Sequence, residues 1–308
     1  MNFNEKNSLR KTCSGIGFLV FASAVLLYIT PYSMSIISGI FGINPLNATL
    51  EPIISCVTSI VSLFVVGAIY CKLSSSDMSK LAPVSKVNPG ILWCFVLITL
   101  TVSFISSYMT DIMIDNLSFI GITSKQLPGS EYNGGFSVLL QVISVAAVPA
   151  LVEEFLFRGI ILHKLLPYGN AFAILITTAL FAMLHGNIVQ IPFAFVGGLA
   201  MAFSVIKTNS LLPSIISHFF INLLSVVLDA ANYYEIPTYI QNTFYFIVLF
   251  ILVLGGVLAA FILSSQKEFF KTNPGKYRFR ECMGACFGSV GIVFTGIFLI
   301  LRTVINTL

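Results

Sequence analysis

The amino-acid sequence predicts an all-α protein, a polytopic transmembrane helical bundle with about nine spans. Of the 308 residues, 57% are hydrophobic and only 9% are charged, and the mean hydropathy is +0.96. A soluble domain carries roughly 25% charged residues, so this chain has too few to cover a water-exposed surface. Membrane β-barrels alternate apolar and polar residues in segments of about ten, and no part of this sequence follows that pattern.

Apolar stretches long enough for a membrane helix, about 20 residues each, follow one another along the chain. A turn with the sequence LPYGN at 166–170 separates two of them, and the two on either side of His185 are the shortest. We expect helices near residues 15–39, 52–71, 91–113, 135–166, 170–185, 188–206, 210–228, 239–264 and 284–306.

The distribution of Lys and Arg predicts the orientation, because cytoplasmic loops are enriched in these residues. With the N-terminus inside, alternate loops contain most of the basic residues, and the last of these loops, 264–281, is strongly basic. The opposite loops contain acidic residues such as Glu51, Asp229 and Glu235. We therefore expect a cytoplasmic N-terminus and a C-terminus outside. This bias accounts for the net charge of +4, and no nucleic-acid partner is expected.

Three successive predicted helices carry ionisable or amide residues within their apolar spans. An ionisable group at bilayer depth costs at least about 2.5 kcal/mol, so such residues usually face a bundle interior or a wet cavity. The chain has only three histidines, and two of them belong to this set. Its members are Glu153, Glu154 and Arg158, then His185, then His218 and Asn222.

Helical spacing places the two adjacent glutamates on different faces of their helix. Glu154 and Arg158 are four residues apart and can pair on one face, whereas Glu153 is rotated by about 100° and is left free. Pro149 predicts a kink just before them. Counted from the turn at 166–170, Glu153 and His185 lie at similar depth, roughly 21–23 Å. His218 and Asn222 lie about 13–20 Å from the same side, so the three groups can converge.

A glutamate, two histidines and an asparagine are suited to hydrolysis by an activated water. Glu153 would act as general base with help from His185, and His218 with Asn222 would donate hydrogen bonds to the developing oxyanion. Glu153, His185 and His218 would also suit Zn²⁺ with an open position for water. Neither HExxH nor GxSxG occurs in the sequence, and both a zinc mechanism and a metal-free glutamate mechanism stay open.

The residues also carry a family resemblance. EEFLFR at 153–158 fits an EExxxR pattern, FAMLH at 181–185 fits FxxxH, and HFFIN at 218–222 fits HxxxN. Their order on successive apolar helices resembles the CPBP family, the CAAX prenyl endopeptidase-like intramembrane proteases, which include bacteriocin-processing and self-immunity proteins. The resemblance covers about 134–228.

The resemblance implies an intramembrane endopeptidase of the bacterial cell membrane whose substrates are hydrophobic or lipidated peptides, of the prenylated CAAX or leader type. It implies that Glu153 activates water with His185, that His218 and Asn222 stabilise the oxyanion, and that Glu154 and Arg158 support them. Membrane lipids would be its surroundings. The chain then divides into N-terminal helices (1–133), a catalytic core (134–228) and C-terminal helices with the basic loop (229–308).

Two non-catalytic hypotheses compete with this one. Chains of Glu and His also build proton relays in membrane transporters, so a proton-coupled transporter is one alternative. A bacteriocin immunity protein that keeps the site but acts through partner contacts is the other. Transporters of this kind often contain paired halves with corresponding helix interruptions, and the sequence has no such halves.

Overall fold

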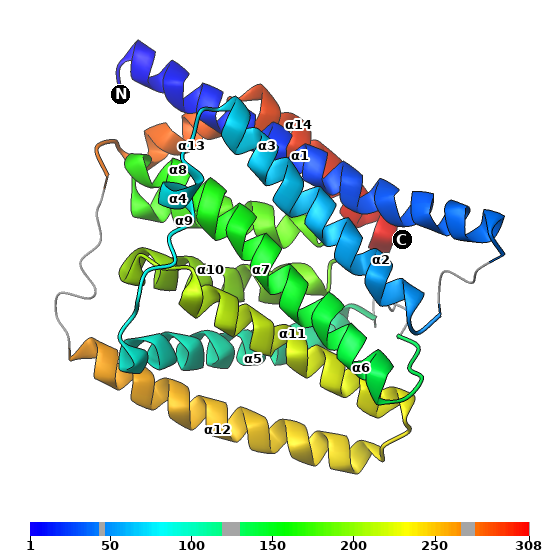
Figure 1. The fold of residues 1–308 in the computed structure, drawn as a ribbon. Coiled ribbons are helices and arrows are strands. Elements are labelled where there is room, and N and C mark those ends of the chain that lie inside the picture. The colour runs from blue at the N-terminus through cyan, green and yellow to red at the C-terminus, as the bar shows by residue number, and fades with distance from the viewer. Residues whose placement is uncertain (43–46, 119–129, 266–274, 308) are drawn as a thin grey trace.

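The computed structural model describes residues 1–42, 47–118, 130–265 and 275–307, and helices account for most of them. Within these ranges β structure is limited to one isolated bridge, between Val84 and Ser210. The all-α fold predicted from composition is therefore confirmed. The elements form a bundle of long, obliquely packed helices (Figure 1).

The helices follow one another in three groups. The first comprises α1 (Phe3–Ile40), α2 (Leu50–Ser59), η1 (Ile60–Val65), α3 (Val66–Leu73), α4 (Met78–Leu81) and α5 (Pro89–Ser118). The second comprises α6 (Gly135–Gln141), η2 (Val142–Ala147), α7 (Val148–Glu154), η3 (Phe155–Ile161), α8 (Leu162–Leu165), η4 (Leu166–Tyr168), α9 (Asn170–Leu184), α10 (Gln190–Thr208) and α11 (Leu212–Tyr233). The last comprises α12 (Thr238–Ser264), α13 (Phe279–Phe287) and α14 (Val290–Thr307). Here η1, η2 and η3 are π-helical turns.

The described residues contain seven helices that are long and apolar enough to cross a membrane, and the bent pair α13–α14 would be an eighth. The remaining apolar helix, α9, has 15 residues and is shorter than a full span. Each of the nine predicted segments corresponds to one of these helices or helix pairs. The predicted turn at 166–170 is present, with Gly169 at φ +123° between η4 and α9.

The prediction of one continuous helix at 284–306 is wrong. The structure has α13 and α14 bent by 73° at Gly288–Ser289 instead of one straight helix. Close packing explains the bend, because α14 lies directly on α1. A Cβ on Gly291 would lie 2.0 Å from the carbonyl oxygen of Ser14, and one on Gly17 would lie 2.2 Å from the backbone of Gly291. Only glycine allows this approach, and α14 follows α1 as a result.

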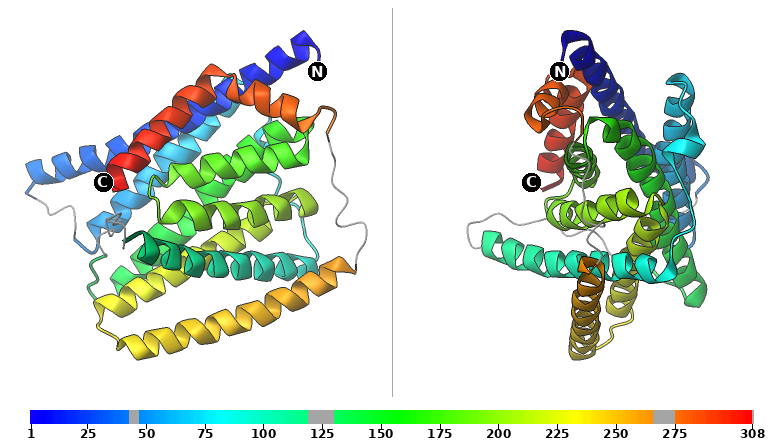
Figure 2. Two further views of the ribbon diagram at one scale, coloured as in Figure 1. Left: turned by 180° about the vertical axis from the view of Figure 1, so that it is seen from behind. Right: turned by 90° about the vertical axis from the view of Figure 1, so that its left-hand side faces the viewer.

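The predicted loops gather at two ends of the bundle (Figures 1 and 2). The N-terminus shares one end with the turns after α3, η4, α10 and α12, where contacts join Lys164 to Ser76, Leu211 to Pro83 and Lys276 to Glu5. At the opposite end, contacts join Tyr132 to Asp229, Gln141 to Glu51 and Asn306 to Gly186. The two-sided arrangement predicted from the loop charges is thus present, although 266–274 lies outside the described residues. The cytoplasmic placement of the basic end stays a prediction.

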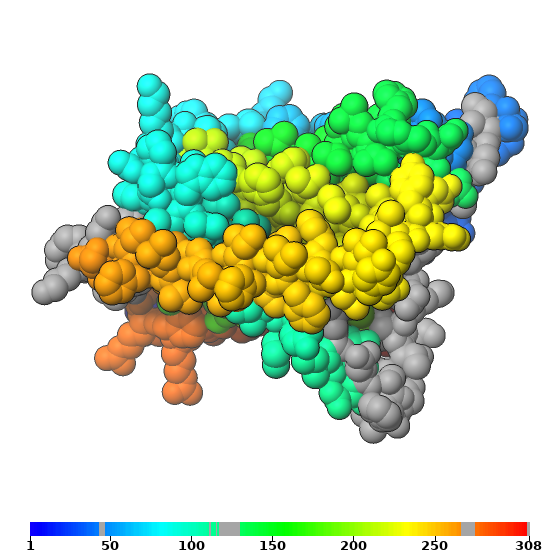
Figure 3. Space-filling model, turned by 90° about the horizontal axis from the view of Figure 1, so that it is seen from below, coloured from blue at the N-terminus to red at the C-terminus, as the bar shows by residue number. Residues whose placement is uncertain are grey.

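The core of the bundle lies around η3 and α9. Leu156, Phe157, Ile160 and Ile161 of η3 are fully buried against these neighbours. In contrast, α12 lies across one face of the molecule (Figure 3) and exposes large apolar side chains such as Phe250 and Leu254. An apolar exposed helix suits a lipid environment, where hydrocarbon covers such a surface. The polar side chains of the site, in contrast, lie in the interior, among helices α7, α9, α10 and α11.

Candidate active site

The two glutamates stand at the end of α7, between two π-helical turns, η2 and η3. A π turn inserts one extra residue and turns the following side chains to a new direction, and such turns often occur at functional sites. His185 caps the C-terminal end of α9. His218 and Asn222 lie one turn apart on α11. Three separate segments thus contribute to one region of the interior.

The ion pair predicted between Glu154 and Arg158 is present. Arg158 Nη1 donates to Glu154 Oε1 at 2.8 Å, and both side chains are fully buried. The guanidinium also stacks over the Phe181 ring, 4.1 Å from its centroid. A Cβ on Gly198 would lie 3.1 Å from Arg158 Nη2, so the missing side chain makes room for the arginine.

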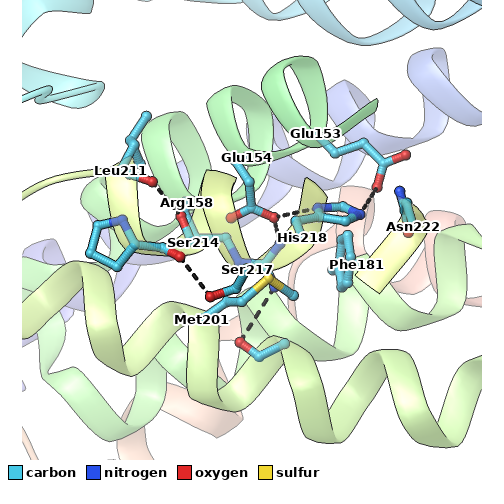
Figure 4. Close-up of polar contacts among 12 residues, drawn as sticks. Glu153, Glu154, Arg158, Phe181, Met201, Leu211, Ser214, Ser217, His218 and Asn222 are labelled. Carbon is cyan, nitrogen blue, oxygen red and sulfur yellow. Dashed lines mark hydrogen bonds and ion pairs between the residues drawn. The ribbon is translucent and has the colours of Figure 1, made fainter. Parts of the chain in front are cut away.

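His218 lies between the two glutamates (Figure 4). Its Nδ1 donates to Glu154 Oε1 at 2.9 Å, and its Nε2 faces Glu153 Oε2 at 3.9 Å. Because a carboxylate only accepts hydrogen bonds, the proton on Nδ1 is assigned to His218. Glu153 is the more accessible glutamate, with 19% of its side chain exposed against 0% for Glu154. The two adjacent glutamates therefore face different nitrogens of one imidazole.

His185 is held by the helix that it ends. Its Nδ1 lies 3.0 Å from the carbonyl oxygen of Phe181, which fixes Nδ1 as the donor and leaves Nε2 as an acceptor. The Phe181 ring meets the imidazole of His185 edge to face at 5.0 Å and that of His218 at 5.8 Å. Phe181 therefore packs against both histidines and the arginine, as a shared wall of the site.

A small cavity opens beside these groups. Its volume is about 30 Å³, and its lining includes His185, His218 and Asn222. A bound water occupies roughly 10–15 Å³ of a cavity, so this cavity has room for about two waters. The site therefore offers water a place next to both histidines.

Asn222 compensates for the proline that precedes the glutamates. Pro149 has no N–H, so the Val145 carbonyl four residues earlier lacks the donor that an α-helix would supply. Asn222 Nδ2 donates to this Val145 oxygen at 3.0 Å. The amide carries two N–H groups, and this bond uses one of them. Asn222 thus connects α11 to the segment that presents Glu153 and Glu154.

Two residues outside the predicted set hold the turn at His185. Arg302 Nη1 donates to the Leu184 carbonyl and Asn306 Nδ2 donates to the Gly186 carbonyl, both at 2.9 Å. Gly186 has φ +61°, and a Cβ there would lie 3.0 Å from Arg302 Nε. The sequence contains a signal that would have found them, because Arg302 is a lone cation in the last apolar span.

The predicted zinc ligands are not gathered into a ligand cluster. Within the described residues, which include Glu153, His185 and His218, no group of three or more His, Cys, Asp and Glu side chains could hold a metal ion. Glu153 and His218 face each other, with Glu153 Oε2 at 3.9 Å from His218 Nε2. As they lie in this structure, Glu153, His185 and His218 do not form a three-ligand zinc site.

Comparison with protein families gives one match. Residues 135–224 match the family model described as type II CAAX prenyl endopeptidase Rce1-like, which confirms the resemblance stated above. The matched segment contains all six predicted site residues and lies within the predicted core, 134–228. Neither the curated proteins nor the solved structures include a match to this chain.

Proposed function

We propose that this chain, whose residues 135–224 carry the Rce1-like type II CAAX prenyl endopeptidase segment, is an intramembrane endopeptidase in which Glu153 activates the attacking water. The observation that carries the proposal is the position of His218, between Glu153 and Glu154, beside a cavity with room for water. The substrate class is a peptide held in or at the membrane.

The hydrogen bonds support a different role for each histidine. His185 donates from Nδ1 to Phe181, so its bare Nε2 can accept a hydrogen from a water. His218 donates from Nδ1 to Glu154, so its Nε2 can donate only when the ring is an imidazolium. We assign the neutral form to His185 and the imidazolium to His218.

These assignments balance the charge of the buried cluster. Glu153 and Glu154 each contribute one negative charge, and Arg158 with protonated His218 contributes two positive charges. An uncompensated charge in a low-dielectric interior is strongly destabilising, whereas a matched and hydrogen-bonded set is tolerated. Glu154 and Arg158 fix His218 from one side, and Glu153 stays the exposed, reactive carboxylate.

The reaction proceeds through a tetrahedral intermediate. Glu153 takes a proton from the water, which His185 Nε2 orients, and the resulting hydroxide adds to the peptide carbonyl. His218 Nε2–H and the second N–H of Asn222 donate hydrogen bonds to the carbonyl oxygen as it becomes negative. Glu153 then returns the proton to the amine as the carbon–nitrogen bond breaks. The products are a carboxylic acid and a free amine.

A purified protein in detergent, given a set of quenched hydrophobic and prenylated peptides, tests the function. We expect cleavage by the wild type, loss of cleavage in Glu153→Ala and His185→Ala, and retention in His163→Ala. His163 is a matched control, because its Nδ1 bonds the Arg158 carbonyl instead of facing the cavity. Absence of cleavage across the set, together with proton-coupled uptake in vesicles, would reject the enzyme in favour of the transporter.

A further inference from the structure

A buried hydroxyl on α5 lies beside the site without a protein partner. Ser103 is 3% exposed, and its Oγ has no hydrogen-bond partner among the described residues. Gly197 of α10 faces it so closely that a Cβ there would lie 2.6 Å from Ser103 Oγ. A buried hydroxyl left unpaired costs about 1–3 kcal/mol, which a bound water or ligand can recover.

Ser103 belongs to the lining of two neighbouring cavities. One is the cavity of about 30 Å³ beside His185, His218 and Asn222. The other has a volume of about 100 Å³ and lies between α5, α10, α11 and α12. Ser103, Phe193 and Ile221 line both. The second cavity therefore adjoins the place where we position the attacking water.

The second cavity, which we call the side pocket, is suited to an apolar group. Its other lining residues are Phe104, Leu224, Leu228 and Tyr245, together with Ser107 and Ser225. A dry cavity of about 150 Å³ accepts benzene, so the smaller side pocket, with about 100 Å³, matches a branched aliphatic side chain. Along α11, Leu224 lies six residues beyond His218, about 9 Å at 1.5 Å per residue.

An extended peptide advances about 3.4 Å per residue. A side chain in the side pocket would therefore belong to a residue about two or three positions from the bond that is cut. Ser103 lies between the two places, where the main chain of the peptide would pass. Its hydroxyl can both donate and accept, so it can pair with either an amide or a carbonyl of that chain.

We propose that the side pocket is a specificity subsite of the peptidase. It takes one aliphatic side chain of the substrate, and Ser103 Oγ hydrogen-bonds the substrate main chain beside it. This inference rests on the proposed function, since it concerns the substrate of the same site. It also places a substrate-binding residue on α5, outside the family-matched segment 135–224.

Filling or enlarging the side pocket tests the subsite. The substrates are pairs of peptides that differ only in having Leu or Ala at one position, taken in turn for each position within three residues of the cleaved bond. The readout is the ratio of kcat/KM for Leu over Ala. Leu224→Trp should lower that ratio at one position by at least about tenfold, whereas Leu224→Ala should shift the preference to larger side chains. Leu258→Trp is the control, because Leu258 is 60% exposed on α12 and lies outside the pocket lining.

Ser103→Ala tests the hydrogen bond separately. Since Ser103 has no protein partner to lose, thermal stability should not fall, while KM rises by about three- to tenfold. Thr101→Val is the control on the same helix, because Thr101 Oγ1 donates to the Leu252 carbonyl and its loss should lower stability and leave KM unchanged.

The outcomes separate the two proposals. A Leu/Ala ratio that is the same in wild type, Leu224→Trp and Leu258→Trp would overturn the subsite while the peptidase stands. Wild-type protein that cleaves none of the peptides would overturn the peptidase and the subsite together. A ratio lowered only in Leu224→Trp, with a raised KM in Ser103→Ala, would support the subsite.

Discussion

Arg158 carries a permanent charge at a position with no exposed surface. Its stability there depends on Glu154, the Gly198 carbonyl and the Phe181 ring. Removing one partner of a buried ion pair leaves the other charge uncompensated, at a cost of about 3–5 kcal/mol. The pair is thus a structural support for His218, whose Nδ1 bonds the same carboxylate oxygen of Glu154.

We predict that Arg158→Ala lowers the unfolding free energy by about 3 kcal/mol or more. Thermal unfolding in detergent measures the loss. The double variant Glu154→Gln/Arg158→Met should recover part of it, since neither charge then remains. Arg280→Ala, an exposed arginine, is the control and should change stability little. Equal unfolding temperatures for Arg158→Ala and wild type would refute the structural role of the pair.

In the segment η2–α7–η3, which presents the glutamates, Pro149 contributes no backbone N–H. Asn222 of α11 bonds the Val145 carbonyl, which an N–H at residue 149 would otherwise meet, so we expect the effects of the amide and the proline to be linked. Without the proline, residue 149 would regain an N–H, and the carbonyl would have a second possible donor. The contribution of Asn222 to stability should then be smaller.

A double-mutant cycle tests this dependence. We expect Asn222→Ala to cost about 1 kcal/mol in the wild-type background, because it leaves a partly buried carbonyl without its donor. In a Pro149→Ala background the same change should cost less, with a coupling energy of at least about 0.5 kcal/mol measured by thermal unfolding. Additive effects would show that Asn222 and Pro149 act independently.

Two side chains of α14 form hydrogen bonds at the C-terminal end of α9. Arg302 and Asn306 donate to the carbonyls of Leu184 and Gly186, on either side of His185. The Leu184 carbonyl is at the C-terminal end of α9, where a cation is favourable. Arg302 thus acts as a positioning residue for His185, with no contact to the proposed reacting atoms.

We predict that Arg302→Ala lowers kcat by about tenfold with little change in KM, because a small displacement of a catalytic group slows the chemical step. Arg302→Lys should restore part of kcat, since it keeps the charge. Kinetics with one hydrophobic peptide measures both constants. A rise in KM at unchanged kcat would contradict the positioning role.

At the scale of the whole molecule, the loops divide between two ends, and the basic loops share the end that holds the N-terminus (Figure 2). Because cytoplasmic loops are enriched in Lys and Arg, we predict that this end lies inside the cell. Ser75 and Glu235 are exposed at opposite ends. The described native cysteines are buried or half-buried, so they give a low labelling background.

Cysteine labelling of intact cells tests this orientation. We predict that Glu235→Cys reacts with a membrane-impermeant maleimide from outside, and that Ser75→Cys reacts only after the membrane is permeabilised. The wild-type protein controls for native thiols. The reverse labelling pattern would show that the chain is inserted the other way round.

The sequence predicted what depends on local spacing. Hydropathy located the helices, and the four-residue interval identified the Glu154–Arg158 pair. Contacts between helices could not be predicted from the sequence. The position of His218 between both glutamates depends on how α11 lies against α7, and the bend between α13 and α14 depends on contact with α1. Arg302 and Ser103 reach the site from helices that carry no recognisable motif.

The most direct test of the central claim is the single-turnover cleavage rate of Glu153→Gln beside that of the wild type. Glutamine keeps the size of the side chain but cannot take a proton from water. We predict a rate lower by at least about 10²-fold, while the protein still inserts into the membrane and folds. Cleavage at the wild-type rate would remove Glu153 from the mechanism.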